Sequence, residues 1–497
     1  MFYKSTRSTE PASRSSAEVI KEGLAADGGL FVPESIPTLT LPEIEALCRK
    51  SYAERAADIL SRFLTDYTHE ELLEDCRNAY RRESFPGGAA PLVGVRSVFP
   101  LEIMELWHGP TAAFKDMALQ IMPRLLSRAL VKTGETRDAL ILVATSGDTG
   151  KAALEGYRDV DRVRILVFYP SNGVSSVQKL QMATQQGANV EVCAIHGNFD
   201  DAQNGVKSIL NSPEMTTRAK VRGTVFSSAN SINWGRLVPQ TVYYISAYCD
   251  LINAGRIKPG ARFNVCVPTG NFGNIFAAWV AKQMGLPIER LICASNSNNV
   301  LTEFLNTGVY DRNRTFHMTV SPSMDILISS NLERLLYFTA GSEKTATWMQ
   351  ELKETGKYAV DPATLKEIRR HFAGYYTSEE DTAETIRETW KNGDYLADPH
   401  TAVAIHAAEQ YLAETGDTNP TVVDSTASPF KFAGSVYRAL TGEDAKSDLE
   451  ALDQLADLTG TKIPYPLAGL AKRPVRFTRV CEVSEMRQVV MDFVKKK

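Results

Sequence analysis

One lysine lies where a predicted strand gives way to a predicted helix, in the stretch WHGPTAAFKDMALQ at residues 107–120. The run before it, FPLEIMELW at 99–107, is apolar enough for a strand, and the run after it has the apolar spacing of a helix. Lys115 therefore falls in the first helical turn, among small and apolar residues. That position and partial burial both lower a lysine pKa, and a partly neutral amine can act as a nucleophile. The simpler interpretation is a surface lysine whose stem covers an apolar face.

A glycine-containing loop, PTGNFGNI at 268–275, joins another apolar strand to a helix. Gly270 and Gly273 allow the backbone to approach a ligand closely, and the helix start that follows favours an anion. The loop therefore predicts a phosphate cup formed by Gly270, Asn271, Phe272, Gly273 and Asn274. Its GxxG spacing excludes the GxGxxG fingerprint and the nucleotide P-loop. A tight turn that binds nothing would explain the loop equally well.

A third loop, ATSGDTGKAA at 144–153, also connects a strand to a helix. Ser146, Asp148 and Thr149 could bind a carboxylate or a phosphate at the helix start. Capping of the helix by serine or aspartate is the alternative.

The stretch SSANSINWGRLVPQ at 227–240 places Asn233 and Arg236 around a tryptophan, on a loop that enters a helix. The planar arginine fork suits a phosphate or carboxylate. Considered alone, a capped helix with a surface arginine is the better explanation.

A later strand ends in VVDSTASPFKF at 422–432, where Thr426 offers a hydroxyl that can hydrogen-bond a heteroaromatic nitrogen. An ordinary strand end is the simpler interpretation. A lysine nucleophile, a separate phosphate cup and a strand-end hydroxyl are together what a pyridoxal 5′-phosphate site requires. We therefore expect this cofactor, with Lys115 as its covalent partner.

Composition narrows the remaining function classes. The chain has 497 residues and a net charge of -4, which gives no sign of nucleic-acid or anionic-membrane binding. No apolar run approaches the length of a membrane span. The seven cysteines form no CxxC pair and the histidines no HExxH pair, so we expect a reducing compartment and no metal site. The N-terminus lacks an apolar signal region, and we expect a cytoplasmic protein, either monomer or homodimer.

The pattern of elements divides the chain into three parts. Residues 1–95 form a helix-rich N-terminal extension that ends in a Gly- and Pro-rich stretch at 84–94, which is typical of a linker. From 96 to about 440, short apolar runs alternate with helices, which predicts a parallel α/β sheet covered on both faces. Residues 441–497 form a mixed C-terminal segment packed on this core.

The sequence resembles the threonine synthase family, of the long type with an extended N-terminal region. The resemblance spans nearly the whole chain, through ADGGLFVPE, HGPTAAFKDMALQ, TSGDTG, NSINWGRLVPQ, PTGNFGN, PSMDILISSNLERLL and ADPHTAVA in the family's order. One departure is STASPFKF, where Ser428 stands in place of the family's usual histidine. The family belongs to the tryptophan-synthase-β-like, fold type II enzymes. It implies two open, mostly parallel twisted sheets flanked by helices, with the cofactor between them.

The resemblance also implies roles for the candidate residues. Lys115 would hold pyridoxal 5′-phosphate and move protons, and Thr426 would face the pyridine nitrogen. The phosphate of the cofactor would lie in the cup at 270–274, and a smaller lobe at about 130–225 would close over it. The expected substrate is O-phospho-L-homoserine, converted with water to L-threonine and phosphate by γ-elimination and β-addition. The expected substrate contacts are Ser146, Asp148 through its backbone amide, Thr149, Asn233 and Arg236, with Ser323, Asp325 and Asn331 as weaker candidates.

Three alternatives remain open at the sequence level. A threonine-synthase-like phospho-lyase would use the same lysine and anion pockets but release phosphate without adding water. A β-replacing enzyme or dehydratase of the same fold group usually has its lysine in another local context than HGPTxAFKD. A protein that only binds a small anion would leave Lys115 unmodified.

Overall fold

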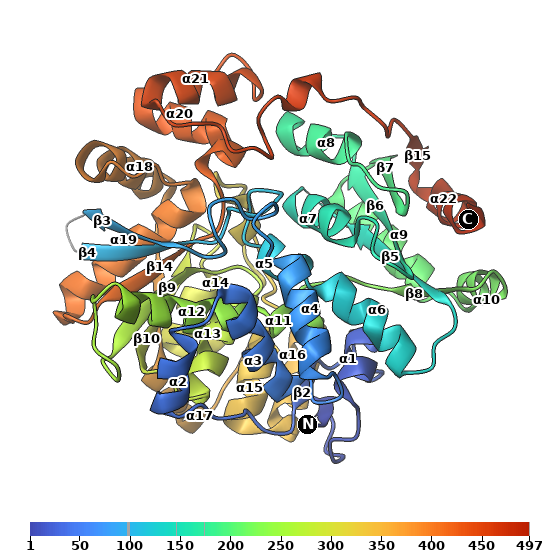
Figure 1. Cartoon of the computed structure of the whole chain (residues 1–497), viewed down its shortest axis with the longest axis horizontal. Coiled ribbons are helices and arrows are strands. Elements are labelled where there is room, and N and C mark those ends of the chain that lie inside the picture. The colour runs from blue at the N-terminus through green and yellow to red at the C-terminus, as the bar shows by residue number, and fades with distance from the viewer. Residues whose placement is uncertain (97–99, 146, 173, 497) are drawn as a thin grey trace.

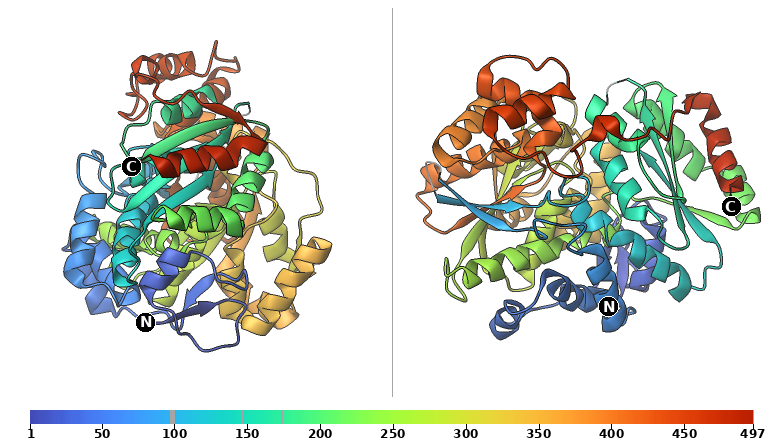
Figure 2. Two further views of the ribbon diagram at one scale, coloured as in Figure 1. Left: turned by 90° about the vertical axis from the view of Figure 1, so that its right-hand side faces the viewer. Right: turned by 45° about the horizontal axis from the view of Figure 1, so that its top comes forward.

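Two mostly parallel sheets stand side by side, with helices on both faces of each (Figure 1). The structure is a computed structural model, and it describes residues 1–96, 100–145, 147–172 and 174–496. Figure 2 shows the two sheets as separate halves joined by the segments between them. The expected α/β class and its mostly parallel sheets are confirmed.

The larger sheet has six strands in the order β13-β10-β9-β14-β4-β3. Every neighbouring pair is parallel except β3 and β4, which are antiparallel. Its strands are β3 (Leu92–Arg96), β4 (Pro100–Glu105), β9 (Phe263–Pro268), β10 (Ile288–Ser295), β13 (Phe372–Tyr376) and β14 (Thr421–Ser425). Because β3 begins at residue 92, the last part of the stretch that the sequence analysis interprets as a linker is a strand.

The smaller sheet has five parallel strands in the order β15-β7-β6-β5-β8. They are β5 (Asp138–Ala144), β6 (Val163–Pro170), β7 (Val190–His196), β8 (Thr224–Ser227) and β15 (Val480–Glu482). The C-terminal segment thus supplies the edge strand β15, and α22 (Met486–Lys495) packs its apolar residues against the same sheet. The end of the chain therefore closes the sheet that carries the 144–153 loop.

Helices cover both sheets. Those beside the larger sheet are α12 (Gln240–Asn253), α13 (Gly273–Gln283), α14 (Val300–Thr307), α17 (Pro362–His371), α18 (Glu379–Gly393) and α19 (Pro399–Thr415), with α15 (Leu332–Ala340), α16 (Ser342–Thr355), α20 (Ala433–Thr441) and α21 (Glu450–Thr459) further out. Those beside the smaller sheet are α6 (Met122–Lys132), α7 (Asp148–Tyr157), α8 (Ser176–Ala183), α9 (Phe199–Leu210) and α10 (Pro213–Val221). The short helices α5 (Asp116–Leu119) and α11 (Trp234–Leu237) pack against each other, and Figure 1 shows α5 between the two halves.

The N-terminal extension packs against both halves. It contains a two-stranded ribbon, β1 (Tyr3–Ser5) with β2 (Phe31–Pro33), and the helices α1 (Ser16–Glu22), α2 (Leu41–Leu47), α3 (Tyr52–Phe63) and α4 (His69–Ala79). Its α2 and α3 pack on α12 of the larger half, and its α1 packs on α6 of the smaller half. The buried Arg55 of α3 donates at 2.7 Å to both Ser246 and Asp250 of α12. A second small ribbon, β11 (Val309–Asp311) with β12 (Lys357–Ala359), lies near α14 and α16.

Gly156 allows α7 to pack closely on α5, the helix that follows Lys115. A Cβ at residue 156 would overlap the backbone carbonyl oxygen of Leu119, which is the last residue of α5. Gly156→Ala should therefore lower the free energy of unfolding by about 1–3 kcal/mol, because overpacking forces the backbone to shift. Urea unfolding measures this loss. Gly434→Ala, where a Cβ meets nothing within 4 Å, should cause no comparable loss.

Candidate active site

Lys115 lies between the two sheets, immediately before α5. Its side chain is 12% exposed, and its Nζ is 3.7 Å from Oδ2 of Asp148, the first residue of α7. The same Nζ donates to Ser323 Oγ at 3.2 Å. The lysine of the larger half therefore faces the helix start of the smaller half.

Burial lowers the pKa of Lys115 to about 8. The Asp148 carboxylate opposes this effect, while the nearby cations Lys431 and Arg236 add to it. A measurable fraction of the amine is thus neutral near pH 7, as a nucleophilic lysine requires. This excludes the simple surface lysine that the sequence alone left open.

The predicted phosphate cup lies at the start of α13. Phe272 adopts φ 61°, in the left-handed region, where a bulky residue is strained. A Cβ at Gly270 would lie 2.6 Å from the carbonyl oxygen of Ser323, so the close approach of these two segments requires glycine. The first amides of a helix lack internal partners and favour an anion. The cup residues 270–274 are therefore arranged as a phosphate site would need.

Two residues behind the cup fix its carbonyl groups, and sequence analysis assigned neither of them to this task. Ser329 Oγ donates to the Gly270 carbonyl at 2.6 Å, and Asn331 Nδ2 donates to the Asn271 carbonyl at 2.9 Å. Both carbonyls are therefore held by side chains of the segment that precedes α15. Asn331, a weaker candidate for substrate contact, thus has a structural task in the cup.

The strand-end residues after β14 lie beside the Lys115 loop. The Thr426 carbonyl accepts the Phe114 amide at 2.8 Å, which places Thr426 next to the segment that carries Lys115. Ser428, which stands in place of the family's histidine, is fully buried and its hydroxyl accepts the Phe430 amide at 3.3 Å. The serine thus caps the short turn at Pro429–Phe432.

The 144–153 loop brings one charged side chain to the site. Asp148 is buried, and two lysines hold the pKa of its carboxyl well below its usual range in spite of burial. Thr149 follows it in the first turn of α7 and is half-buried. Ser146, the third candidate of this loop, lies outside the described residues.

Asn233 and Arg236 are both buried, but their side chains are used differently. The Asn233 carboxamide accepts the Gly235 amide and donates to the Ile20 carbonyl, each at 2.9 Å, so it joins α11 to α1. Arg236 donates to the Ala229 carbonyl at 2.9 Å and has no carboxylate within ion-pair distance among the residues described. Burial lowers its pKa to about 10, so the guanidinium remains charged. An unpaired buried cation next to Lys115 indicates an anionic ligand.

The segment around Ser323 is held by residues of the ADPHTAVA stretch. The Ser323 amide donates to His400 Nε2 at 3.1 Å, so that nitrogen is an acceptor and Nδ1 carries the proton toward Asp398 Oδ1 at 2.7 Å. Asp325 accepts from Thr319 in its own loop and from Asn296 and Asn298 in the loop that follows β10. Ser323 therefore reaches Lys115, whereas Asp325 stabilises the loop.

A buried acid lies behind the cup and the strand end. Tyr244 Oη is 3.0 Å from the Asn274 carbonyl and 2.7 Å from Asp424 Oδ2. One phenol proton cannot serve both acceptors, so a protonated Asp424 donates to Tyr244, which in turn donates to Asn274. Burial raises the pKa of Asp424 to about 8, which agrees with this arrangement. Tyr244 thus links β14 to the phosphate cup through a neutral carboxyl group.

Because Asp424 is protonated in the folded protein, the free energy of unfolding should fall as the pH rises. Its folded pKa of about 8 lies above the unfolded value of about 3.9, so the folded state binds the extra proton between these values. The stabilisation is complete below about pH 4 and is lost toward pH 8, by about 1.4 kcal/mol per pH unit. Asp424→Asn should remove this slope, as measured by urea unfolding at pH 6 and pH 8. Tyr244→Phe, which keeps the carboxyl, should retain it; an unchanged slope in Asp424→Asn would contradict the assignment.

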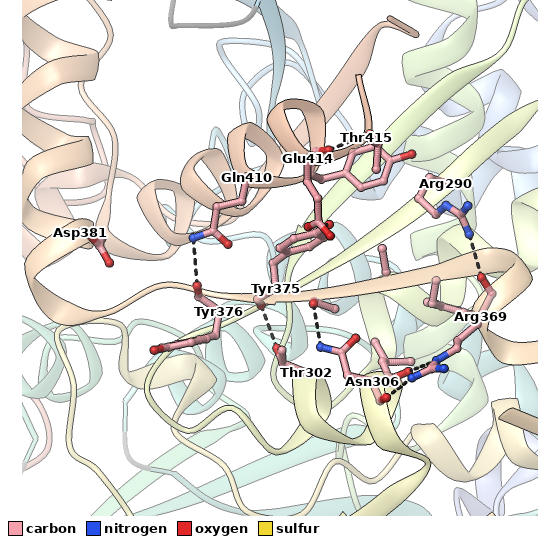
Figure 3. A pocket seen from close by; sticks show the side chains of 15 residues that line it. Arg290, Thr302, Asn306, Arg369, Tyr375, Tyr376, Asp381, Gln410, Glu414 and Thr415 are labelled. Atoms are coloured by element: carbon pink, nitrogen blue, oxygen red, sulfur yellow. Dashed lines mark hydrogen bonds between the residues drawn. The ribbon is translucent and has the colours of Figure 1, made fainter. Parts of the chain in front are cut away.

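A separate hollow of about 570 Å³ lies at the edge of the larger sheet, beside β13 (Figure 3). Several polar side chains in it already bind backbone carbonyls: Thr302 to Tyr375 at 2.8 Å, Arg290 to Arg369 at 2.8 Å and Gln410 to Tyr376 at 3.3 Å. None of the predicted site residues lines it. The hollow therefore lies apart from the predicted site around Lys115.

Among the residues that the structure describes, no group of three or more histidine, cysteine, aspartate or glutamate residues is placed to hold a metal ion. None of the helices in the described part of the chain combines the length and the apolar character needed to cross a membrane.

These features fit pyridoxal 5′-phosphate. Gly270 leaves room for a phosphate near the left-handed Phe272, Lys115 has a partly neutral amine, and Arg236 adds an unpaired positive charge. Residues 84–424 match a family described as "Pyridoxal-phosphate dependent enzyme". Residues 84–424 therefore belong to the pyridoxal phosphate-dependent enzyme family.

The two ends of the chain match more specific families. Residues 2–80 match "Threonine synthase N terminus" and residues 401–490 match "Threonine synthase, C-terminal". The chain belongs to the threonine synthase family, as its sequence motifs predicted.

Three relatives show how far the similarity extends. Human "Threonine synthase-like 1" is 41% identical over 437 residues, which cover 85% of this chain and 58% of that protein. The chain thus spans less than two thirds of that relative. Threonine synthase of Pseudomonas aeruginosa is 40% identical over 450 residues, which cover 89% of this chain and 91% of that protein. The crystal structure of pyridoxal phosphate-bound threonine synthase from Brucella melitensis has a TM-score of 0.88 and 37% identity, and covers all of both chains.

Proposed function

We propose that the protein converts O-phospho-L-homoserine and water to L-threonine and inorganic phosphate. The observation that carries this proposal is the surplus of buried positive charge: the low-pKa carboxylate of Asp148 faces two lysines, Lys115 and Lys431, and Arg236 adds a third cation near Lys115. A substrate with both a carboxylate and a phosphate would balance that charge. The similarity to a bacterial threonine synthase over most of both chains supports the same substrate.

Each residue of the site has a proposed task. Lys115 binds the cofactor and then moves protons at carbon atoms of the substrate, because its amine is partly neutral. Residues 270–274 bind the cofactor phosphate, and Thr426 faces the pyridine nitrogen. Thr149 and the Asp148 amide bind a substrate anion at the start of α7, and Ser146 and Arg236 are assigned to the substrate anions as well. Pyridoxal phosphate, when bound, supplies the electron sink for negative charge at carbon.

Closure of the smaller lobe, residues 130–225, would exclude water until it is needed. Asp148 on this lobe already contacts Lys431 on the larger half at 2.7 Å, so the two halves are tied together at the site. Exclusion of water would prevent wasteful protonation of the substrate. Asn233 would act at the lobe boundary, where its carboxamide holds α11 to α1.

A phospho-lyase is the second candidate, and one observation favours it. The human relative at 41% identity bears the name "Threonine synthase-like 1" rather than threonine synthase. A phospho-lyase would need the same lysine and the same anion contacts, and would differ only in releasing product before water adds.

A product assay distinguishes the two. Purified protein with pyridoxal 5′-phosphate is mixed with O-phospho-L-homoserine, and threonine, 2-oxobutyrate and phosphate are measured together. Threonine equal to phosphate is the expected result. Phosphate with 2-oxobutyrate and no threonine would establish the lyase, and no phosphate release would overturn both proposals.

A further inference from the structure

A second lysine lies beside Lys115, and sequence analysis gave it no role. Lys431 is in the turn Pro429–Phe432 that follows Thr426, and its side chain is fully buried. Its Nζ donates to the Thr111 carbonyl at 3.0 Å and lies 2.7 Å from Asp148 Oδ1. Lys431 therefore touches both the loop that carries Lys115 and the helix start that faces it.

The Asp148 carboxylate is shared unequally between the two lysines. Oδ1 receives Lys431 at 2.7 Å and Gln178 Nε2 at 2.8 Å, which are close hydrogen-bonding distances. Oδ2 is 3.7 Å from Lys115 Nζ, too far for a hydrogen bond. Asp148 is thus anchored by Lys431 and Gln178, and Lys115 feels its charge only at longer range.

We propose that Lys431 is a positioning residue for Lys115: by anchoring the Asp148 carboxylate, it prevents a close ion pair that would keep the reactive amine protonated. This inference rests on the role proposed above for Lys115. Only the neutral amine has the lone pair that attacks an aldehyde carbon, forming the carbon–nitrogen double bond as water leaves. A lysine locked to a carboxylate would react slowly at neutral pH.

The charges around Lys115 give the direction of the effect. Asp148 of α7 favours the charged amine, whereas Lys431 and Arg236 of α11 disfavour it, and Ser323 adds a neutral hydroxyl. Asp116, next in sequence, is buried and burial raises its pKa to about 7. Removing the Lys431 charge would remove one repulsion and also free Asp148 to approach Lys115. Both changes raise the Lys115 pKa.

The test is the pH dependence of cofactor uptake by the full-length chain. Protein stripped of cofactor by dialysis is mixed with pyridoxal 5′-phosphate, and the rate of the absorbance change is recorded from pH 6 to 10. The wild-type rate should reach half its maximum near pH 8, the pKa of Lys115. In Lys431→Met the midpoint should move up by at least about one pH unit, with roughly tenfold slower uptake at neutral pH.

Three further variants separate this effect from loss of structure. Asp148→Asn should move the midpoint down, opposite to Lys431→Met, because Lys115 loses the carboxylate that favours its charged form. Lys431→Arg, which keeps the charge, should restore the wild-type profile. Lys282→Met removes a half-buried lysine of α13 that donates to the Glu289 carbonyl, and should leave the profile unchanged.

The outcomes are distinct. A folded Lys431→Met protein, judged by its thermal melt, whose midpoint stays in place or moves down overturns the inference alone. If wild-type uptake persists unchanged in Lys115→Ala, the reactive amine is elsewhere, and the proposed role of Lys115 falls together with the inference.

Discussion

Lys115→Ala should abolish threonine formation, with a fall in kcat of about 10⁴-fold or more, because one side chain both binds the cofactor and moves the protons. The visible absorption of the cofactor bound through the lysine should disappear as well. Stopped-flow phosphate release and an absorption spectrum measure the two effects on the same sample.

The matched control is Lys282→Ala in α13. Burial also lowers the pKa of Lys282 to about 8, so it resembles Lys115 in its ionisation. It donates to the Glu289 carbonyl at 2.7 Å, outside the site, and its loss should leave turnover and colour unchanged. Retention of turnover in Lys115→Ala would refute the assignment of the nucleophile.

The parts of the fold that sequence predicts well are the strands buried on both faces. The sequence predicts strands in the apolar runs that begin at residues 138, 162, 188, 262 and 291, each followed by a helical pattern. The structure confirms them as β5, β6, β7, β9 and β10, with β10 beginning three residues earlier than its run. The edge strands escape prediction because they bury less. β15 has only Cys481 buried, with an exposed residue on each side, so nothing in its three residues distinguishes it from a loop. β8 and β13 likewise have partly exposed residues and pair with distant segments.

The sequence predicts part of the candidate site as well, and misses the part that depends on distant contacts. Lys115, the cup and Thr426 could be found because each lies at a strand end, where parallel sheets bind ligands. The pairing of Lys431 with Asp148 joins two segments that are far apart in sequence and lie beside different sheets, so no local pattern reveals it. The sequence offers one indication of Lys431: it is a lysine among apolar residues, in SPFKF, as Lys115 is in TAAFK.

After Lys115, substitution of Arg236 should cause the largest loss of activity. Its side chain is only 6% exposed and pairs with no carboxylate among the described residues, so its charge is compensated only when an anion binds. Arg236→Met keeps the length of the side chain and removes the charge. We expect kcat/KM to fall by about 100-fold or more, because removing one partner of a buried charge pair costs about 2–5 kcal/mol.

The same substitution should leave the unliganded protein at least as stable as the wild type, because a buried unpaired cation is itself costly. Arg334→Met provides the contrast. Arg334 is also fully buried, but it donates to the Phe31 carbonyl at 3.0 Å and the Ile232 carbonyl at 2.6 Å, so its loss should destabilise the protein. Urea unfolding without ligand and turnover with O-phospho-L-homoserine measure the two effects. Inorganic phosphate should raise the melting temperature of the wild type and not of Arg236→Met, whereas an Arg236→Met protein with normal kcat/KM would show that this arginine binds no part of the substrate.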